Sequence, residues 1–134
     1  MILITGIPNA GKTTYSKRYE NVIHFDDIPH RFTNEQYALA NAIALCHGKD
    51  AVIEGVYTTA ERRKQLLDAF KDIDCVKTCI WLDTSVDECV RRERNFRKRP
   101  DSLVTRTAKK FEEPSLSEGW SEILIIKEGD IPNV

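Results

Sequence analysis

The sequence contains no apolar run that approaches the ~20 residues needed to cross a membrane. It begins without the charged stretch and apolar core of an export leader. Its four cysteines, at positions 46, 75, 79 and 89, lack the spacing of a zinc site. We therefore expect a cytoplasmic protein with reduced, buried thiols and no membrane partner. The net charge of −1, from 20 basic and 21 acidic residues, indicates no particular class of partner.

The chain has 134 residues, of which 41% are hydrophobic and 31% charged, and this predicts one globular domain spanning 1–134. Short apolar stretches predict strands at 1–5, 22–25, 51–53, 75–82 and 123–126. Helical patterns and caps lie between them, at 12–20, 33–46, 58–70, 85–99 and 101–111, with Ser85 and Glu88 spaced for a capping box. Such alternation predicts an α/β fold, with a five-stranded parallel sheet flanked by helices.

A glycine-rich loop follows the first predicted strand and opens a helix. Its residues 6–13, "GIPNAGKT", match the Walker A pattern G-x-x-x-x-G-K-T, here called the P-loop. We expect its backbone N–H groups to surround the phosphates of ATP, Lys12 to reach the β and γ phosphates, and the Thr13 hydroxyl to ligate Mg²⁺. No N/T-K-x-D segment of a GTPase is present, but the choice between ATP and GTP stays open. The nucleotide contacts predicted in this segment are Gly6, Asn9, Ala10, Gly11, Lys12, Thr13 and Thr14.

Carboxylates follow three of the predicted strands, at the sheet edge where ligands of parallel sheets bind. Asp26 and Asp27 come directly after the second strand. Adjacent residues point in opposite directions, so one of them is expected to take the proton from a hydroxyl acceptor; the alternative is that both are turn residues before Pro29. Glu54 could hold a Mg²⁺-bound water or orient the acceptor, or it could be only a solvated strand end. Asp83 ends the fourth predicted strand directly before a helix start at Ser85, so a capping role competes with a catalytic one, and we assign it no catalytic role.

Six cations crowd into residues 91–99, before Pro100. Phosphoryl transfer spreads negative charge over the transferred group, and cations that close over it supply much of the catalysis. We therefore predict a short lid at about 91–102, with Arg94, Arg97 or Lys98, and Arg99 facing the phosphate. Arg91 and Arg92 are expected on a solvated face.

Taken in chain order, these features resemble the P-loop polynucleotide 5′-kinases and their relatives among small phosphotransferases. The resemblance covers nearly the whole chain: the Walker A loop, "DD" after the second strand, "TTAERR" after the third, "RRERNFRKR" and the tail "FEEPSLSEGW". It implies that Asp26 is the general base and that Glu54 is the acid after the third strand. It also implies that Arg94 and Lys98 are the lid cations, with Arg97 beside them.

Two departures from the family pattern concern the acceptor. The family usually has Asp, a small polar residue and Asn where this chain has "EGVY", and it tends to have an arginine where this chain has Pro29. Arg31 could replace that arginine through a shifted turn, or the acceptor could be a small hydroxyl compound. The sequence thus predicts an ATP-dependent kinase acting on the 5′-OH of DNA or RNA. The alternatives are a small-molecule kinase and an ATP-binding module without turnover.

Overall fold

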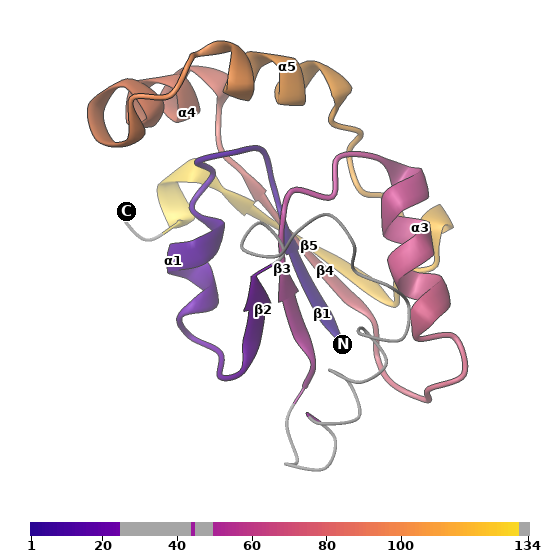
Figure 1. Ribbon diagram of the computed structural model, residues 1–134. Coiled ribbons are helices and arrows are strands. Elements are labelled where there is room, and N and C mark those ends of the chain that lie inside the picture. The colour runs from indigo at the N-terminus through magenta and orange to yellow at the C-terminus, as the bar shows by residue number, and fades with distance from the viewer. Residues whose placement is uncertain (25–43, 45–49, 132–134) are drawn as a thin grey trace.

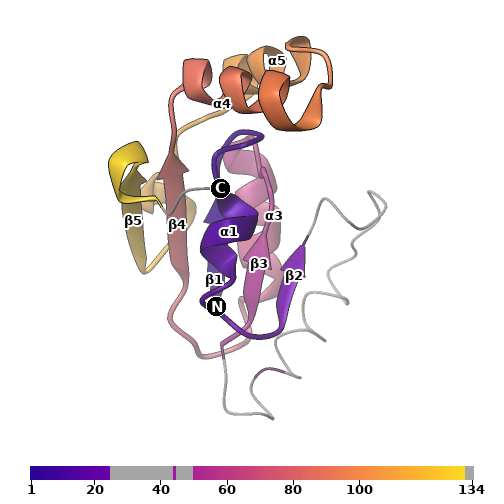
Figure 2. The ribbon, with the colours of Figure 1, turned by 90° about the vertical axis from the view of Figure 1, so that its left-hand side faces the viewer.

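The protein is a three-layer α/β structure around one parallel sheet (Figures 1 and 2). The computed structural model describes residues 1–24, 44 and 50–131. Its strand order is β2-β3-β1-β4-β5, and every strand pair is parallel, which confirms the predicted sheet. The strands are β1 (Ile2–Thr5), β2 (Val22–His24), β3 (Val52–Glu54), β4 (Thr78–Asp83) and β5 (Glu122–Lys127).

The central strands are mainly apolar, as expected where both faces of the sheet are covered. Successive side chains alternate between the two faces, so Leu3 of β1 enters one core and Ile4 the other. Phe70, the C-cap of the helix α3 (Ala60–Ala69), packs in the first core. Tyr15 and Val104 pack in the second core, from α1 (Lys12–Ser16) and α5 (Ser102–Lys110).

Above the carboxyl ends of the strands lie α4 (Val86–Arg92) and α5, joined through a π-helical turn at Glu93–Arg97 (Figures 1 and 2). The segment 91–102, predicted as a lid and called the lid below, therefore lies over the edge where the P-loop emerges. Short 3₁₀ turns at Leu116–Glu118 and Glu128–Asp130 flank β5.

One helix prediction needs correction, and another falls mostly outside the described residues. α1 is shorter than the predicted 12–20, because after Ser16 the backbone bonds become i→i−3, as in Tyr19 N to Ser16 O at 2.9 Å, and tighten into turns. The helix predicted at 33–46 falls outside the described residues except for Ala44, which is helical.

Only one of the two hydrogen bonds of the capping box predicted for α4 is present. The Ser85 hydroxyl accepts from the Glu88 backbone N–H at 3.2 Å, as expected. The reciprocal bond of a capping box is absent from this helix, because the Glu88 carboxylate binds Arg91 and Arg92 instead. The Ser85 N–H donates to Glu128 at 2.9 Å.

The thiols that the structure describes lie in or near the core: Cys79 and Cys89 are buried and Cys75 is half-buried. Within residues 1–24, 44 and 50–131, no three His, Cys, Asp or Glu side chains come together as a metal site. In the same part of the chain, no helix has the length and apolar character to span a bilayer.

Candidate active site

The P-loop is held in its turn by steric and hydrogen-bonding constraints. Asn9 and Gly11 have φ angles of 69° and 103°, in the left-handed region that favours glycine. At Gly6 an added Cβ would come within 3.0 Å of both the Ala10 Cβ and the Leu82 carbonyl oxygen. The buried Thr84 hydroxyl donates to the Ala10 carbonyl oxygen at 2.8 Å, which fixes the loop against the end of β4.

Lys12 lies inside this loop, as the motif predicts. Its residue is 6% exposed, and its Nζ donates to the carbonyl oxygens of Gly6 at 3.1 Å and Ile7 at 2.9 Å. The ammonium group is therefore pre-placed within the turn. Thr13 is exposed and Thr14 half-buried at the start of α1. The contacts of these residues with nucleotide stay predictions.

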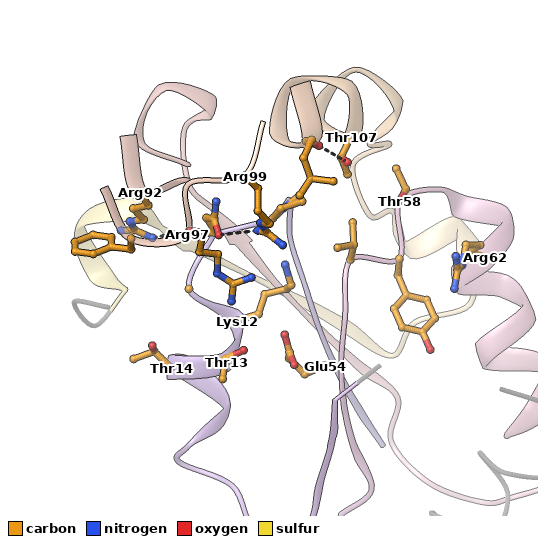
Figure 3. Close-up of a pocket in the computed structure, with 17 residues that line it drawn as sticks. Lys12, Thr13, Thr14, Glu54, Thr58, Arg62, Arg92, Arg97, Arg99 and Thr107 are labelled. Carbon is orange, nitrogen blue, oxygen red and sulfur yellow. Dashed lines mark hydrogen bonds between the residues drawn. The ribbon is translucent and has the colours of Figure 1, made fainter. Parts of the chain in front are cut away.

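A cavity of about 380 Å³ opens beside the P-loop (Figure 3). Its wall comes from three parts of the chain: the P-loop with the start of α1, the segment from the end of β3 into α3, and the lid with α5. The lining residues include Asn9, Gly11, Lys12, Thr13, Thr14, Glu54, Val56, Tyr57, Thr58, Arg62, Arg92, Phe96, Arg97, Arg99, Leu103 and Thr107.

The lid places three arginines on this cavity, namely Arg92, Arg97 and Arg99. Arg97 is exposed, and its side chain makes no hydrogen bond or ion pair with any residue that the structure describes. In Figure 3 its guanidinium extends from the lid toward Lys12. Arg97 thus lines the cavity beside the P-loop, and its contact with phosphate stays a prediction.

Arg92 does not lie on a solvated face, and that expectation was wrong. Its side chain is only 11% exposed, and it donates to the Asn9 carbonyl oxygen at 2.8 Å and to Glu88 at 3.0 Å. Arg92 is the last residue of α4, and its partners are Glu88, one turn earlier, and the P-loop residue Asn9. The π-helical turn that follows is closed by the bond from Lys98 N to Glu93 O, and Arg97 at its end lines the same cavity. Arg91 is exposed and paired with Glu88, as expected.

The structure does not bring Arg94 or Lys98 to the cavity. The exposed Arg94 guanidinium pairs with Asp101 at 2.6 Å, away from the P-loop. Lys98 is exposed and has a φ of 57°, where it ends the π-helical turn. Both residues remain candidate phosphate ligands from the sequence, but this arrangement of the lid directs them elsewhere.

Glu54 lies in the cavity wall and is not a solvated strand end. It is 3% exposed, and its Oε2 lies 2.7 Å from His24 Nδ1. His24 belongs to no motif in the sequence, although β2 and β3 end side by side with these two residues in register. The pair fixes the orientation of the carboxylate. Asp83, in contrast, pairs with Lys127 at 2.7 Å.

The segment after β3 is pinned at three successive carbonyl groups. Val56 O accepts from the Thr5 hydroxyl at 2.5 Å, Tyr57 O from Arg63 Nη1 at 2.8 Å, and Thr58 O from the Glu112 backbone N–H at 2.8 Å. Tyr57 has a φ of 43°, a costly angle for an aromatic residue. Three elements therefore hold this side of the cavity in one conformation.

Arg63, the last residue of "TTAERR", belongs to a buried ionic network. Its residue is fully buried, and its Nε and Nη2 donate to the two carboxylate oxygens of Glu118 at 2.7 and 3.0 Å. Trp120 Nε1 also donates to Glu118, at 3.1 Å. Burial favours a raised pKa for Glu118, but the bonds from Arg63 and Trp120 lower it overall. The tail "SLSEGW" thus contributes to the wall of the cavity through Arg63.

The predicted acceptor residues Asp26, Asp27 and Arg31 lie outside the described residues. Their roles stay predictions. They follow β2, whose last residue, His24, contacts Glu54.

Comparison with known proteins identifies the fold. No protein-family model and no curated protein matched the sequence. Solved structures with the same fold include a gluconokinase from Sinorhizobium meliloti 1021 (15% identity, TM-score 0.64, 97% of this chain and 85% of that one). A second is Chaetomium thermophilum Kti12 in complex with ADP-AlF3 (18% identity, TM-score 0.65, 94% of this chain and 88% of that one). A third is a sugar kinase from Janibacter sp. HTCC2649 (14% identity, TM-score 0.65, 96% of this chain and 84% of that one). The chain therefore has the fold of the P-loop kinases.

Proposed function

We propose that this chain is an ATP-dependent phosphotransferase that moves the γ-phosphate to a hydroxyl group. The observation that carries the proposal is the meeting of Lys12 and Arg97 at one cavity. One cation comes from a Walker A loop and the other from the lid on the opposite side. A transferring phosphoryl group held between them would have its developing charge stabilised from two directions.

ATP is the donor in this proposal. Its phosphates replace the loop carbonyl groups as partners of Lys12, and the Thr13 hydroxyl ligates the accompanying Mg²⁺. The metal neutralises charge on the phosphates when bound. The described residues fit such a metal at Thr13, which is exposed and lines the cavity, so its hydroxyl oxygen is available as a ligand.

Arg97 acts as the principal lid cation because it needs no rearrangement to reach the cavity. Arg99 and Arg92 also line the cavity, but each already has a carboxylate partner. Arg94 and Lys98, which the family resemblance implies, would act only after Arg94 leaves Asp101 and the lid turns.

The acceptor side is proposed from the sequence. Asp26 takes the proton from the acceptor hydroxyl, with Asp27 and Arg31 binding the acceptor, and Glu54 orients it with the support of His24. The family resemblance favours the 5′-OH of DNA or RNA as the acceptor. A small hydroxyl compound is the second candidate, because two neighbours that share this fold are a gluconokinase and a sugar kinase.

The test uses ATP labelled at the γ-phosphate, Mg²⁺ and a 5′-OH oligonucleotide, with the 5′-phosphorylated oligonucleotide as the matched control. Label should transfer to the first oligonucleotide only. A parallel panel of sugars, sugar acids and nucleosides, with ADP release as the readout, tests the second candidate. If the protein binds ATP but transfers phosphate to no acceptor, the proposal is contradicted, and the alternative of an ATP-binding module without turnover holds.

Two variants separate binding from chemistry. Asp26→Ala should abolish transfer and leave ATP affinity largely unchanged, whereas Lys12→Ala should weaken both. If Asp26→Ala keeps full activity, the general base is not Asp26, and Asp27→Ala is the next variant to measure.

A further inference from the structure

We propose that Glu93 is a positioning residue that holds Arg99 and the P-loop residue Asn9 in one arrangement for phosphoryl transfer. This inference rests on the proposed function. Glu93 does not line the cavity and would touch neither ATP nor the acceptor. It would act through the two residues that it binds, both of which do line the cavity.

Glu93 is the only carboxylate in the described part of the chain with no exposed surface. Burying a carboxylate costs several kcal/mol unless it is paired and fully hydrogen-bonded. Glu93 meets this condition: it accepts from the Asn9 amide at 3.0 Å, the Arg99 backbone N–H at 2.9 Å and the Arg99 guanidinium at 2.8–3.0 Å. The bonds from Arg99 are the main reason that its pKa falls to about 2, so it remains ionised at neutral pH.

The bonds to Glu93 fix the direction of the Arg99 guanidinium. They use the Nε and Nη2 edge of this planar group. Nη1 has no hydrogen-bond partner within the part of the chain that the structure describes. Because the group is rigid, fixing one edge sets where the Nη1 donors point, and Arg99 lines the cavity.

Asn9 joins the same network from the P-loop. Its amide nitrogen donates to Glu93 and to the Cys89 carbonyl oxygen at 3.2 Å, and its own carbonyl oxygen accepts from Arg92 at 2.8 Å. Its amide oxygen lies 3.5 Å from Arg99 Nη2. The P-loop and the lid are thus bonded together at a residue with a left-handed backbone. Glu93 is the anion at the centre of that junction.

The chain offers a matched control for a variant of Glu93. Glu118 is also a buried carboxylate with a two-oxygen contact to one arginine, here Arg63. It also accepts from one further side chain, Trp120, and from one backbone N–H, that of Ser115. Glu93→Gln and Glu118→Gln therefore remove a similar charge from similar surroundings, but only the first lies between the P-loop and the lid.

The experiment measures two affinities by calorimetry. The first is for ADP with Mg²⁺, and the second is for ADP with Mg²⁺ and aluminium fluoride, which mimics the transferring group. The ratio of the two affinities is the preference for the mimic complex. No acceptor is needed. We expect the wild-type protein to bind the mimic complex more tightly than ADP alone. In Glu93→Gln this preference should fall by about tenfold or more, while ADP affinity changes by less than about threefold. Glu118→Gln keeps an oxygen that accepts from Arg63, so the cavity wall should stay in place; this variant should lower the melting temperature and keep the preference.

Arg99→Lys provides the second variant, because this half-buried side chain can be replaced without emptying the core. It should lose the preference to a similar extent, and adding Glu93→Gln should cause little further loss, since both act through one contact. Additive effects would overturn the inference, as would an unchanged preference in Glu93→Gln or an equal loss in Glu118→Gln. A wild-type protein without any preference would contradict the proposed function itself, and the inference with it.

Discussion

Replacing Arg63 by methionine should destabilise the fold strongly. Arg63→Met keeps a long side chain but removes three donors. Glu118 then loses its cationic partner while still buried, and the Tyr57 carbonyl oxygen loses its side-chain donor. The effect arises mainly from the carboxylate that is left behind, because a buried charge without a partner is unfavourable.

The magnitude follows from the burial of this pair. The side chains of Arg63 and Glu118 are 0% and 3% exposed, so water cannot replace the lost contact. Removing one partner of such a pair costs about 3–5 kcal/mol. With an unfolding entropy of about 2.1 cal/mol/K per residue, the 134-residue chain has about 0.28 kcal/mol/K. The melting temperature should therefore fall by about 11–18 °C.

Differential scanning calorimetry at pH 7 measures this shift, and urea unfolding gives the free energy. Arg63→Met/Glu118→Leu is the matched double variant. It removes the charge as well as its partner, so it should recover part of the loss. A fall of less than about 3 °C in Arg63→Met, or a double variant less stable than the single one, would refute the reasoning.

Three further outcomes are expected. Arg97→Gln should lower kcat by about a hundredfold with little change in KM for ATP, whereas Arg91→Gln, on the outer face of the lid, should keep wild-type kinetics in the same ADP-release assay. The pKa of Glu118 lies below its ordinary value of 4.5, so the contribution of Glu118 to stability is present above that pH and is lost as the pH falls through the lowered pKa. Urea unfolding from pH 7 to pH 3 should show this loss of stability, and the loss should be smaller in a variant without the Arg63 partner. Burial raises the pKa of Cys79 to about 12, so Cys75 should react with iodoacetamide well before Cys79 in the native protein, as followed by peptide mass spectrometry.

The fold could be predicted because its signals are local. Each strand is a short apolar run, and the P-loop is specified by residues within one turn. The lid was harder to predict, because a regular helix would place Arg94 and Lys98, four residues apart, on one face. The π-helical turn at Glu93–Arg97 changes that phase after Arg92, and the residues that line the cavity are Arg92 and Arg97.

The contacts that complete the site join residues far apart in the sequence. His24 and Glu54 are separated by 30 positions, and Arg63 and Glu118 by 55. No local pattern marks such pairs, since each member resembles an ordinary surface residue in its own segment. The burial of Glu93 could not be predicted for the same reason, because within "RRERNFRKR" it is one acidic residue in a run of charged ones.

The pinned segment after β3 also has a consequence for biosynthesis. Its conformation depends on Glu112 and Glu118, which leave the ribosome long after the P-loop does. A nascent chain that ends before these residues could form the phosphate turn but not the opposite wall. Nucleotide capture during translation would therefore be delayed until the last part of the domain emerges, and shortened translation products should bind ATP poorly despite an intact Walker A motif.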